Sequence, residues 1–133
     1  MTAEDTPSPK ITRCKSISEW IWVKSKGGSY LQSQILNNHG FEHAFFTREW
    51  QGKGPYELAK YLEKKTSIHS LKQVHGEKII NASQTNPKNI YIADGLISDL
   101  EAQSLWISSA DCIPVLIANP ITGQVAACHA GWR

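Results

Sequence analysis

The sequence predicts an α/β domain of mixed β-sheets flanked by helices. Short apolar segments of strand-like composition recur along most of the chain, and one stretch with helical spacing interrupts them. The 133 residues fit one domain, and the 41% hydrophobic content suffices for a core, whereas a disordered chain would be poorer in apolar residues. The sequence stops directly after its last predicted strand, so we expect a fold that is incomplete at the C-terminus.

The first half of the chain predicts a hairpin, a third strand and a helix. Residues 20–23 and 30–36 are two short strands around a glycine-containing turn, and 41–47 is the next strand. Residues 56–65 have the spacing of a short amphipathic helix, with Pro55 in its first turn, where the missing N–H is no loss.

The second half predicts a series of strands. They are expected at 70–74, 77–81, 91–97, 104–108, 113–118 and 123–129. The nearly continuous apolar run at 113–118 is typical of a strand that is buried on both faces. At the other end of the chain, residues 1–15 have the polar, proline-containing composition of a flexible tail, which leaves 16–133 as the domain.

Composition and charge exclude several classes of protein. Fourteen basic and 12 acidic residues give a net charge of +2, which offers no support for nucleic-acid or membrane binding. No apolar run approaches the roughly 20 residues that span a bilayer, and the polar N-terminus does not resemble a signal peptide. Three cysteines without a CxxC pair do not indicate a disulfide framework, so we expect a cytoplasmic protein.

Three polar residues stand at predicted strand ends in apolar surroundings: His75, Cys112 and His129. Their spacing is too wide for a zinc finger, but strand ends that are far apart in sequence can meet in space. Two histidines and a cysteine would leave the fourth position of a zinc ion open, as in catalytic rather than structural sites. Residue types alone favour the structural alternative, since a lone histidine is more often a core or surface residue and a lone cysteine a small buried hydrophobe.

Three of four short motifs contain these residues. The stretches KQVHG at 72–76, ADG at 93–95, ADCIPVL at 110–116 and HAGWR at 129–133 occur in this order. They resemble the motifs of the YfiH-type family, long labelled multicopper polyphenol oxidase or laccase-domain proteins, whose members are regarded as purine nucleoside phosphorylases with adenosine deaminase activity. The resemblance extends from about residue 40 to residue 133.

The resemblance implies a layered sandwich, with zinc bound by His75, Cys112 and His129. It further implies phosphorolysis of purine nucleosides (adenosine, inosine, guanosine or methylthioadenosine) by phosphate, and deamination of adenosine. One alternative is a copper-dependent polyphenol oxidoreductase, for which five histidines are few. The other is an inactive truncated fragment or a zinc-binding interaction module, because the family continues well beyond the HAGWR motif.

Three further positions are candidates for substrate binding or catalysis. Arg48 matches an arginine at a strand end of the family, where its planar fork would suit a phosphate; otherwise it is a surface arginine. Gln73 would bind phosphate or ribose, or fill a strand position. Asp111 would orient a ligand or shuttle a proton, or cap the turn that follows it. The segment at 49–55 departs from the glycine-rich stretch of the family, so contacts from that loop do not carry over.

The remaining cysteines and histidines have structural interpretations. Cys128 precedes His129 in a strand and should therefore face the opposite side, in the core. Cys14 is expected to be free in the tail, and Trp132 to pack beneath the site. His39, His43 and His69 match no motif, and for them we expect surface or structural roles.

Overall fold

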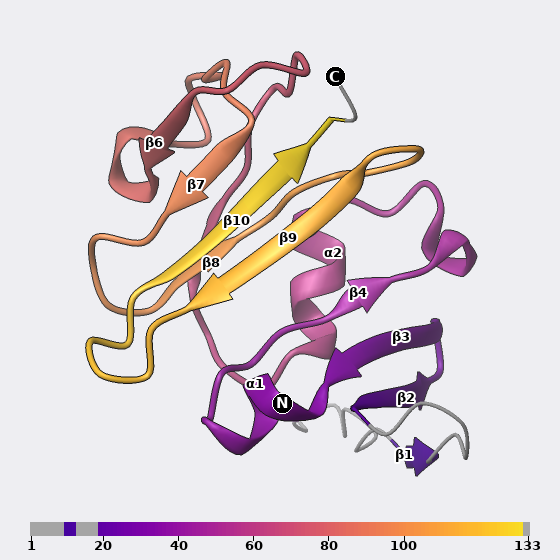
Figure 1. The fold of residues 1–133 in the computed structure, drawn as a ribbon. Helices are drawn as coiled ribbons and strands as arrows, with labels where there is room; N and C mark the ends of the chain where they lie inside the picture. The colour runs from indigo at the N-terminus through magenta and orange to yellow at the C-terminus, as the bar shows by residue number, and fades with distance from the viewer. Residues whose placement is uncertain (1–9, 13–18, 132–133) are drawn as a thin grey trace, which may run out of the picture. The chain divides into compact units, whose positions relative to one another are not determined.

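A computed structural model describes residues 10–12 and 19–131 of the chain (Figure 1). The chain divides into two compact units, Met1–Glu63 and Lys64–Arg133, and each has β-sheets of its own. The single domain predicted over 16–133 stays a prediction. Among the described residues, no helix is long and apolar enough to cross a membrane.

The first unit contains an antiparallel sheet of four strands in chain order. These are β1 (Lys10–Thr12), β2 (Trp20–Ser25), β3 (Gly28–Ser33) and β4 (Phe45–Phe46). The predicted hairpin is therefore confirmed as β2 and β3, whereas the predicted strand at 41–47 shrinks to two residues. β1 lies within the predicted flexible tail and pairs with β2, so the tail prediction is wrong for its three residues. The rest of the tail, at 1–9 and 13–15, lies outside the described residues.

A helix that the sequence did not predict follows β3. It is α1 (Gln34–Asn38), and the strand predicted to continue to residue 36 ends at Ser33 instead. The Ser33 hydroxyl accepts a hydrogen bond from the Leu36 amide (3.4 Å), which caps the new helix. This side-chain cap favours a helix after Ser33, and the spacing of apolar residues does not reveal such a cap.

The predicted helix at 56–65 is shorter than expected. It consists of α2 (Pro55–Leu58), with proline in its first turn, and the 3₁₀ turn η2 (Ala59–Tyr61). One helical turn is unstable on its own, so tertiary packing must hold it in place. The Tyr61 ring meets the buried Trp50 edge-on, with 4.7 Å between the ring centroids. Trp50 belongs to a second 3₁₀ turn, η1 (Arg48–Trp50), and donates its indole N–H to the Ser29 carbonyl (2.8 Å).

The second unit contains a mixed four-stranded sheet and a parallel strand pair. The mixed sheet has the order β6 (Ile79–Asn81), β7 (Gly95–Ile97), β10 (Val125–Ala130) and β9 (Ile113–Ala118). The pair consists of β5 (Ser67–His69) and β8 (Gln103–Leu105). β6 runs parallel to β7, and β10 is antiparallel to both of its neighbours. Mixed sheets with few helices confirm the predicted α/β class.

The strand predicted at 70–74 is wrong, and β5 was missed. Residues around Lys72 form a loop that touches Ile92 through one isolated bridge. The other predicted strands of this unit are present, most of them shorter than expected. After β10, Trp132 and Arg133 lie outside the described residues, as does the packing predicted for Trp132.

The hydrophobic core of the second unit is small. It consists of Ile80, Ala93 and Leu96, with Leu71, Tyr91 and Leu105 packed against it. The prediction that 113–118 is buried on both faces is wrong. Ile113 is 67% exposed and Ile117, on the same face of β9, is 56% exposed. An apolar run does not by itself reveal whether both faces of a strand are covered.

His43 provides a structural histidine in the first unit, as predicted. Its Nε2 accepts a hydrogen bond from the Ser33 amide (2.7 Å), so Nδ1 carries the hydrogen and donates to the Phe41 carbonyl (2.9 Å). Burial lowers the pKa of His43 below 6.5, against the smaller opposing effect of the Phe41 carbonyl.

We predict that His43 makes the stability of the chain depend on pH. Its folded pKa lies below its unfolded value, so stability is complete above pH 6.5 and falls as the pH drops toward the folded pKa. Denaturant unfolding at several pH values should give a flatter dependence for His43→Gln. The exposed His39→Gln should keep the wild-type slope; equal slopes in all three proteins would contradict the prediction.

Candidate metal centre

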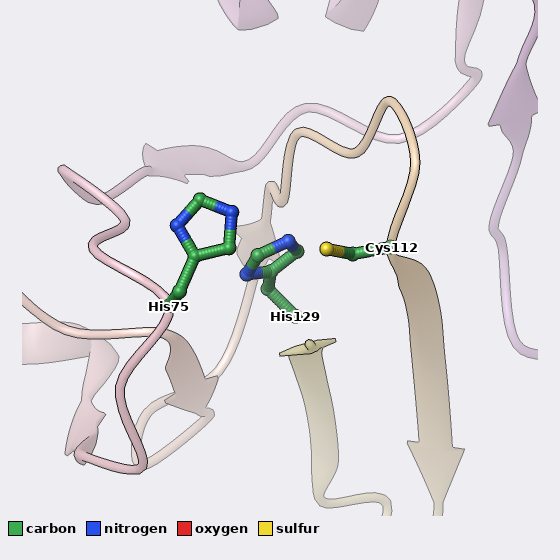
Figure 2. Close-up of side chains that lie close together, drawn as sticks. All are labelled: His75, Cys112 and His129. Atoms are coloured by element: carbon green, nitrogen blue, oxygen red, sulfur yellow. The ribbon is translucent and has the colours of Figure 1, made fainter. Parts of the chain in front are cut away.

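The structure brings His75, Cys112 and His129 together in the second unit (Figure 2). One donor atom from each side chain lies within 4.8 Å of the other two. In Figure 2 the Cys112 sulfur points toward the His129 ring, and the centroids of the two imidazole rings are 5.0 Å apart. No other such group of three is found in the described part of the chain.

Strand register positions two of these residues. His129 lies in β10 opposite Pro114 of β9, and Ala130 lies opposite Ile113. Cys112 directly precedes Ile113, so it stands where the paired strands end, next to His129. The antiparallel pairing of β9 and β10 therefore brings the thiol and the imidazole to the same end of the two strands.

His75 comes from the loop before β6 and has an unusual backbone. Its φ of 62° lies in the left-handed region, which costs a residue with a Cβ of order 1–3 kcal/mol. The Asp94 carboxylate compensates for this conformation by accepting hydrogen bonds from three successive amides. Val74 and Gly76 donate to Oδ1 (3.1 and 3.0 Å), and His75 donates to Oδ2 (2.9 Å).

Asp94 also binds His129. Its Oδ2 is 2.9 Å from Nδ1 of His129, and its carbonyl accepts the His129 amide at 2.7 Å. Asp94 is only 3% exposed, and burial alone would raise its pKa. The hydrogen bonds from Gly76, His129, Val74 and His75 outweigh that effect and lower the pKa of Asp94 to about 2. The carboxylate is therefore ionised, and Nδ1 of His129 donates to it.

The sequence analysis quoted Asp94 in the ADG motif but gave it no role. The available signal was an acidic residue in the middle of the apolar strand predicted at 91–97. Such a buried carboxylate needs partners, and here it has four hydrogen-bond donors.

Gln73 makes a two-way contact with the segment before Cys112. Its side-chain amide donates to the Ser108 carbonyl (2.6 Å), and its side-chain oxygen accepts the Ser108 amide (2.8 Å). This contact ties the His75 loop to the Cys112 segment. Ser109 adds a local bond, since its hydroxyl donates to the Cys112 carbonyl.

The other predicted site residues are less closely tied to the three ligand candidates. Asp111 is exposed in the bend next to Cys112. Arg48 is exposed in η1 of the first unit, whereas the three ligand candidates belong to the second unit. Cys128 is half-buried and free, and burial raises the pKa of its thiol. Cys14 lies outside the described residues.

The geometry can accommodate a metal ion. His129 uses Nδ1 toward Asp94, which leaves Nε2 with its lone pair as a donor. The exposure of the residues increases from the buried His129 through Cys112 to the exposed His75. Three protein ligands, of which one is exposed, would leave the fourth coordination position of a metal ion accessible.

We predict that metal binding depends on Cys112 and not on Cys128. A cobalt(II) ion bound through sulfur shows a thiolate-to-metal absorption band, so Cys112→Ser should lose this band. Its metal affinity should fall by more than the about 10–100-fold that is typical when a partner of a ligand is removed. Cys128→Ser is the matched control, one residue from His129 on the opposite face of β10, and should keep the band. A band that follows Cys128 instead would refute the ligand set.

A second prediction concerns Gln73. Gln73→Ala removes the link between the two loops, so metal affinity measured by chelator competition should fall by about 10-fold, the lower end of the range for supporting residues. Gln124→Ala is the control, because the Gln124 amide bonds the Ser98 carbonyl (2.9 Å) at the far end of β10. Equal affinities for the two variants would show that the contact with Ser108 does not support the site.

Comparison with known proteins agrees with the motifs. The family described as multi-copper polyphenol oxidoreductase laccase matches residues 56–133. A purine nucleoside phosphorylase from Synechocystis is 40% identical in an alignment of 124 positions that covers 86% of this chain and 45% of that protein. The purine nucleoside phosphorylase YfiH of Escherichia coli is 38% identical over 63 residues, which are 47% of this chain and 26% of that protein.

A solved structure shares the fold. The crystal structure of a Neisseria meningitidis protein of the DUF152 family superposes with a TM-score of 0.51 at 21% identity, over 95% of this chain and 51% of that protein. The chain thus spans about half the length of that protein and less than half of the two relatives above. The match over 56–133 confirms the resemblance of the four motifs, and the chain belongs to the family described as multi-copper polyphenol oxidoreductase laccase, the YfiH-type family.

Proposed function

We propose that the protein is a zinc-dependent purine nucleoside phosphorylase, which cleaves adenosine, inosine, guanosine or methylthioadenosine with phosphate and also deaminates adenosine. The observation that carries the proposal is the convergence of His75, Cys112 and His129 within 4.8 Å. It occurs in a chain that is 40% identical to a purine nucleoside phosphorylase.

The donor set suits zinc, and the number of histidines argues against a multicopper centre. Zinc accepts a mixed set of imidazole and thiolate ligands and leaves an open position in catalytic sites. A multicopper enzyme needs many histidines, but the chain has five. His43 and His69 are buried and have both ring nitrogens in structural hydrogen bonds, so neither is available as a ligand. The three ligand candidates therefore account for one metal ion.

The chain's own residues would divide the work as follows. A zinc ion held by His75, Cys112 and His129 would supply Lewis-acid polarisation of the substrate. Asp111, exposed next to Cys112, is proposed to accept or deliver a proton at its carboxylate. Arg48 is proposed as a phosphate contact, since its guanidinium can donate two parallel hydrogen bonds to an oxyanion. Gln73 is proposed to serve chiefly by holding the Cys112 segment, and its remaining hydrogen-bonding capacity would face substrate.

The test is adenosine turnover by the purified, zinc-loaded chain with and without phosphate. Phosphorolysis predicts adenine and a ribose phosphate only when phosphate is present, whereas deamination predicts inosine in either buffer. Cys112→Ser should lose turnover, and Cys128→Ser should keep it. Stoichiometric copper with oxidation of a phenol would overturn the proposal in favour of an oxidoreductase. Zinc binding without turnover would overturn it in favour of a zinc-binding fragment or interaction module.

A further inference from the structure

The Asp94 side chain contacts two of the three ligand-bearing segments directly. Its carboxylate has two oxygens, and each accepts two hydrogen bonds. Oδ1 binds the amides on either side of His75, and Oδ2 binds the His75 amide and the His129 ring. One buried anion therefore joins a loop to strand β10 at the metal centre.

The contact with His129 determines which nitrogen is free. Both oxygens of Asp94 accept backbone N–H groups, so the carboxylate is also the acceptor toward His129, and Nδ1 of His129 carries the hydrogen. Nε2 is then unprotonated and can donate its lone pair, as in carboxylate–histidine–metal arrangements. The Asp94 carboxylate also restrains rotation of the His129 ring, because turning the ring would break the 2.9 Å hydrogen bond between Nδ1 and Oδ2.

The contact with the loop determines where His75 stands. Three successive amides at 74–76 converge on the carboxylate because His75 has a left-handed backbone. Such a concave set of N–H groups favours an anion at its centre. Without the carboxylate, the amides would lose their acceptors and the left-handed turn would lose its support.

We propose that Asp94 is a positioning residue that assembles the metal centre before the metal binds, fixing the His129 tautomer and the His75 loop with one carboxylate. The proposal rests on the proposed function only in taking His75, Cys112 and His129 as metal ligands. Asparagine cannot replace Asp94, since its amide group would direct hydrogens at one of the two pairs of donors.

The first experiment records the His129 tautomer by ¹⁵N NMR in the metal-free full chain, at a pH above the ordinary histidine pKa of about 6.5. The wild type should show a protonated Nδ1 and an unprotonated Nε2. Asp94→Asn should shift the population toward the other tautomer or a mixture. The wild-type reading tests the proposal even if the variant fails to fold, because a protonated Nε2 in the wild type would overturn it.

The second experiment measures zinc and cobalt(II) affinity by chelator competition. Asp94→Asn should lose about 10–100-fold in affinity. Asp99→Asn is the matched control: Asp99 also accepts bonds from a backbone amide and side chains, those of Ser83 and Gln103, but contacts none of the ligand candidates. Affinities of the two variants within about twofold of each other would overturn the proposal. The wild type could bind neither metal while Asp94→Asn still shifts the His129 tautomer. That result would support the positioning role of Asp94 and would count only against the proposed function.

Discussion

The second unit depends on the placement of one buried negative charge. Asp94 stands directly before β7, donates its own amide to the Lys78 carbonyl (2.9 Å), and receives the His129 amide and the three loop amides. It thereby links the start of β7, the loop before β6 and the end of β10. The backbone of Asp94 holds the start of β7 and the end of β10, and its carboxylate holds the loop before β6 and the His129 ring. The candidate metal centre lies where these segments meet.

The sequence predicted those parts of the fold that are set by local pattern. The hairpin of β2 and β3 and the strands β9 and β10 follow from apolar runs and turn residues, and the structure contains them. The motifs also placed His75, Cys112 and His129, which the structure brings together, at segment ends. Apolar spacing failed where polar contacts matter. Ser33 caps an unexpected helix through a local bond, and the loop near Lys72 is held by distant contacts, from Gln73 to Ser108 and from Val74 to Asp94.

Asp94 and β9 are two examples of structural features that the local sequence pattern does not reveal. Asp94 lies inside the strand predicted at 91–97, and only the folded chain shows which donors surround its carboxylate. The run at 113–118 predicts a strand buried on both faces, yet β9 leaves Ile113 and Ile117 exposed. Whether a face is buried depends on what packs against it, and those contacts join residues distant in sequence. No window of residues along the chain contains that information.

The three ligand candidates differ in how firmly the fold holds them, and this difference bears on how a metal would bind. His129 is buried in a paired strand and anchored by Asp94, so it is in place before any ion arrives. Cys112 and His75 stand on connecting segments, joined to each other through the contact of Gln73 with Ser108. The His75 loop is held by the same Asp94 carboxylate, so a metal would meet two imidazoles that are already positioned and would order chiefly the Cys112 segment. Because metal affinity includes the cost of ordering its ligands, the hydrogen bonds of Asp94 and Gln73 would contribute to affinity without touching the ion.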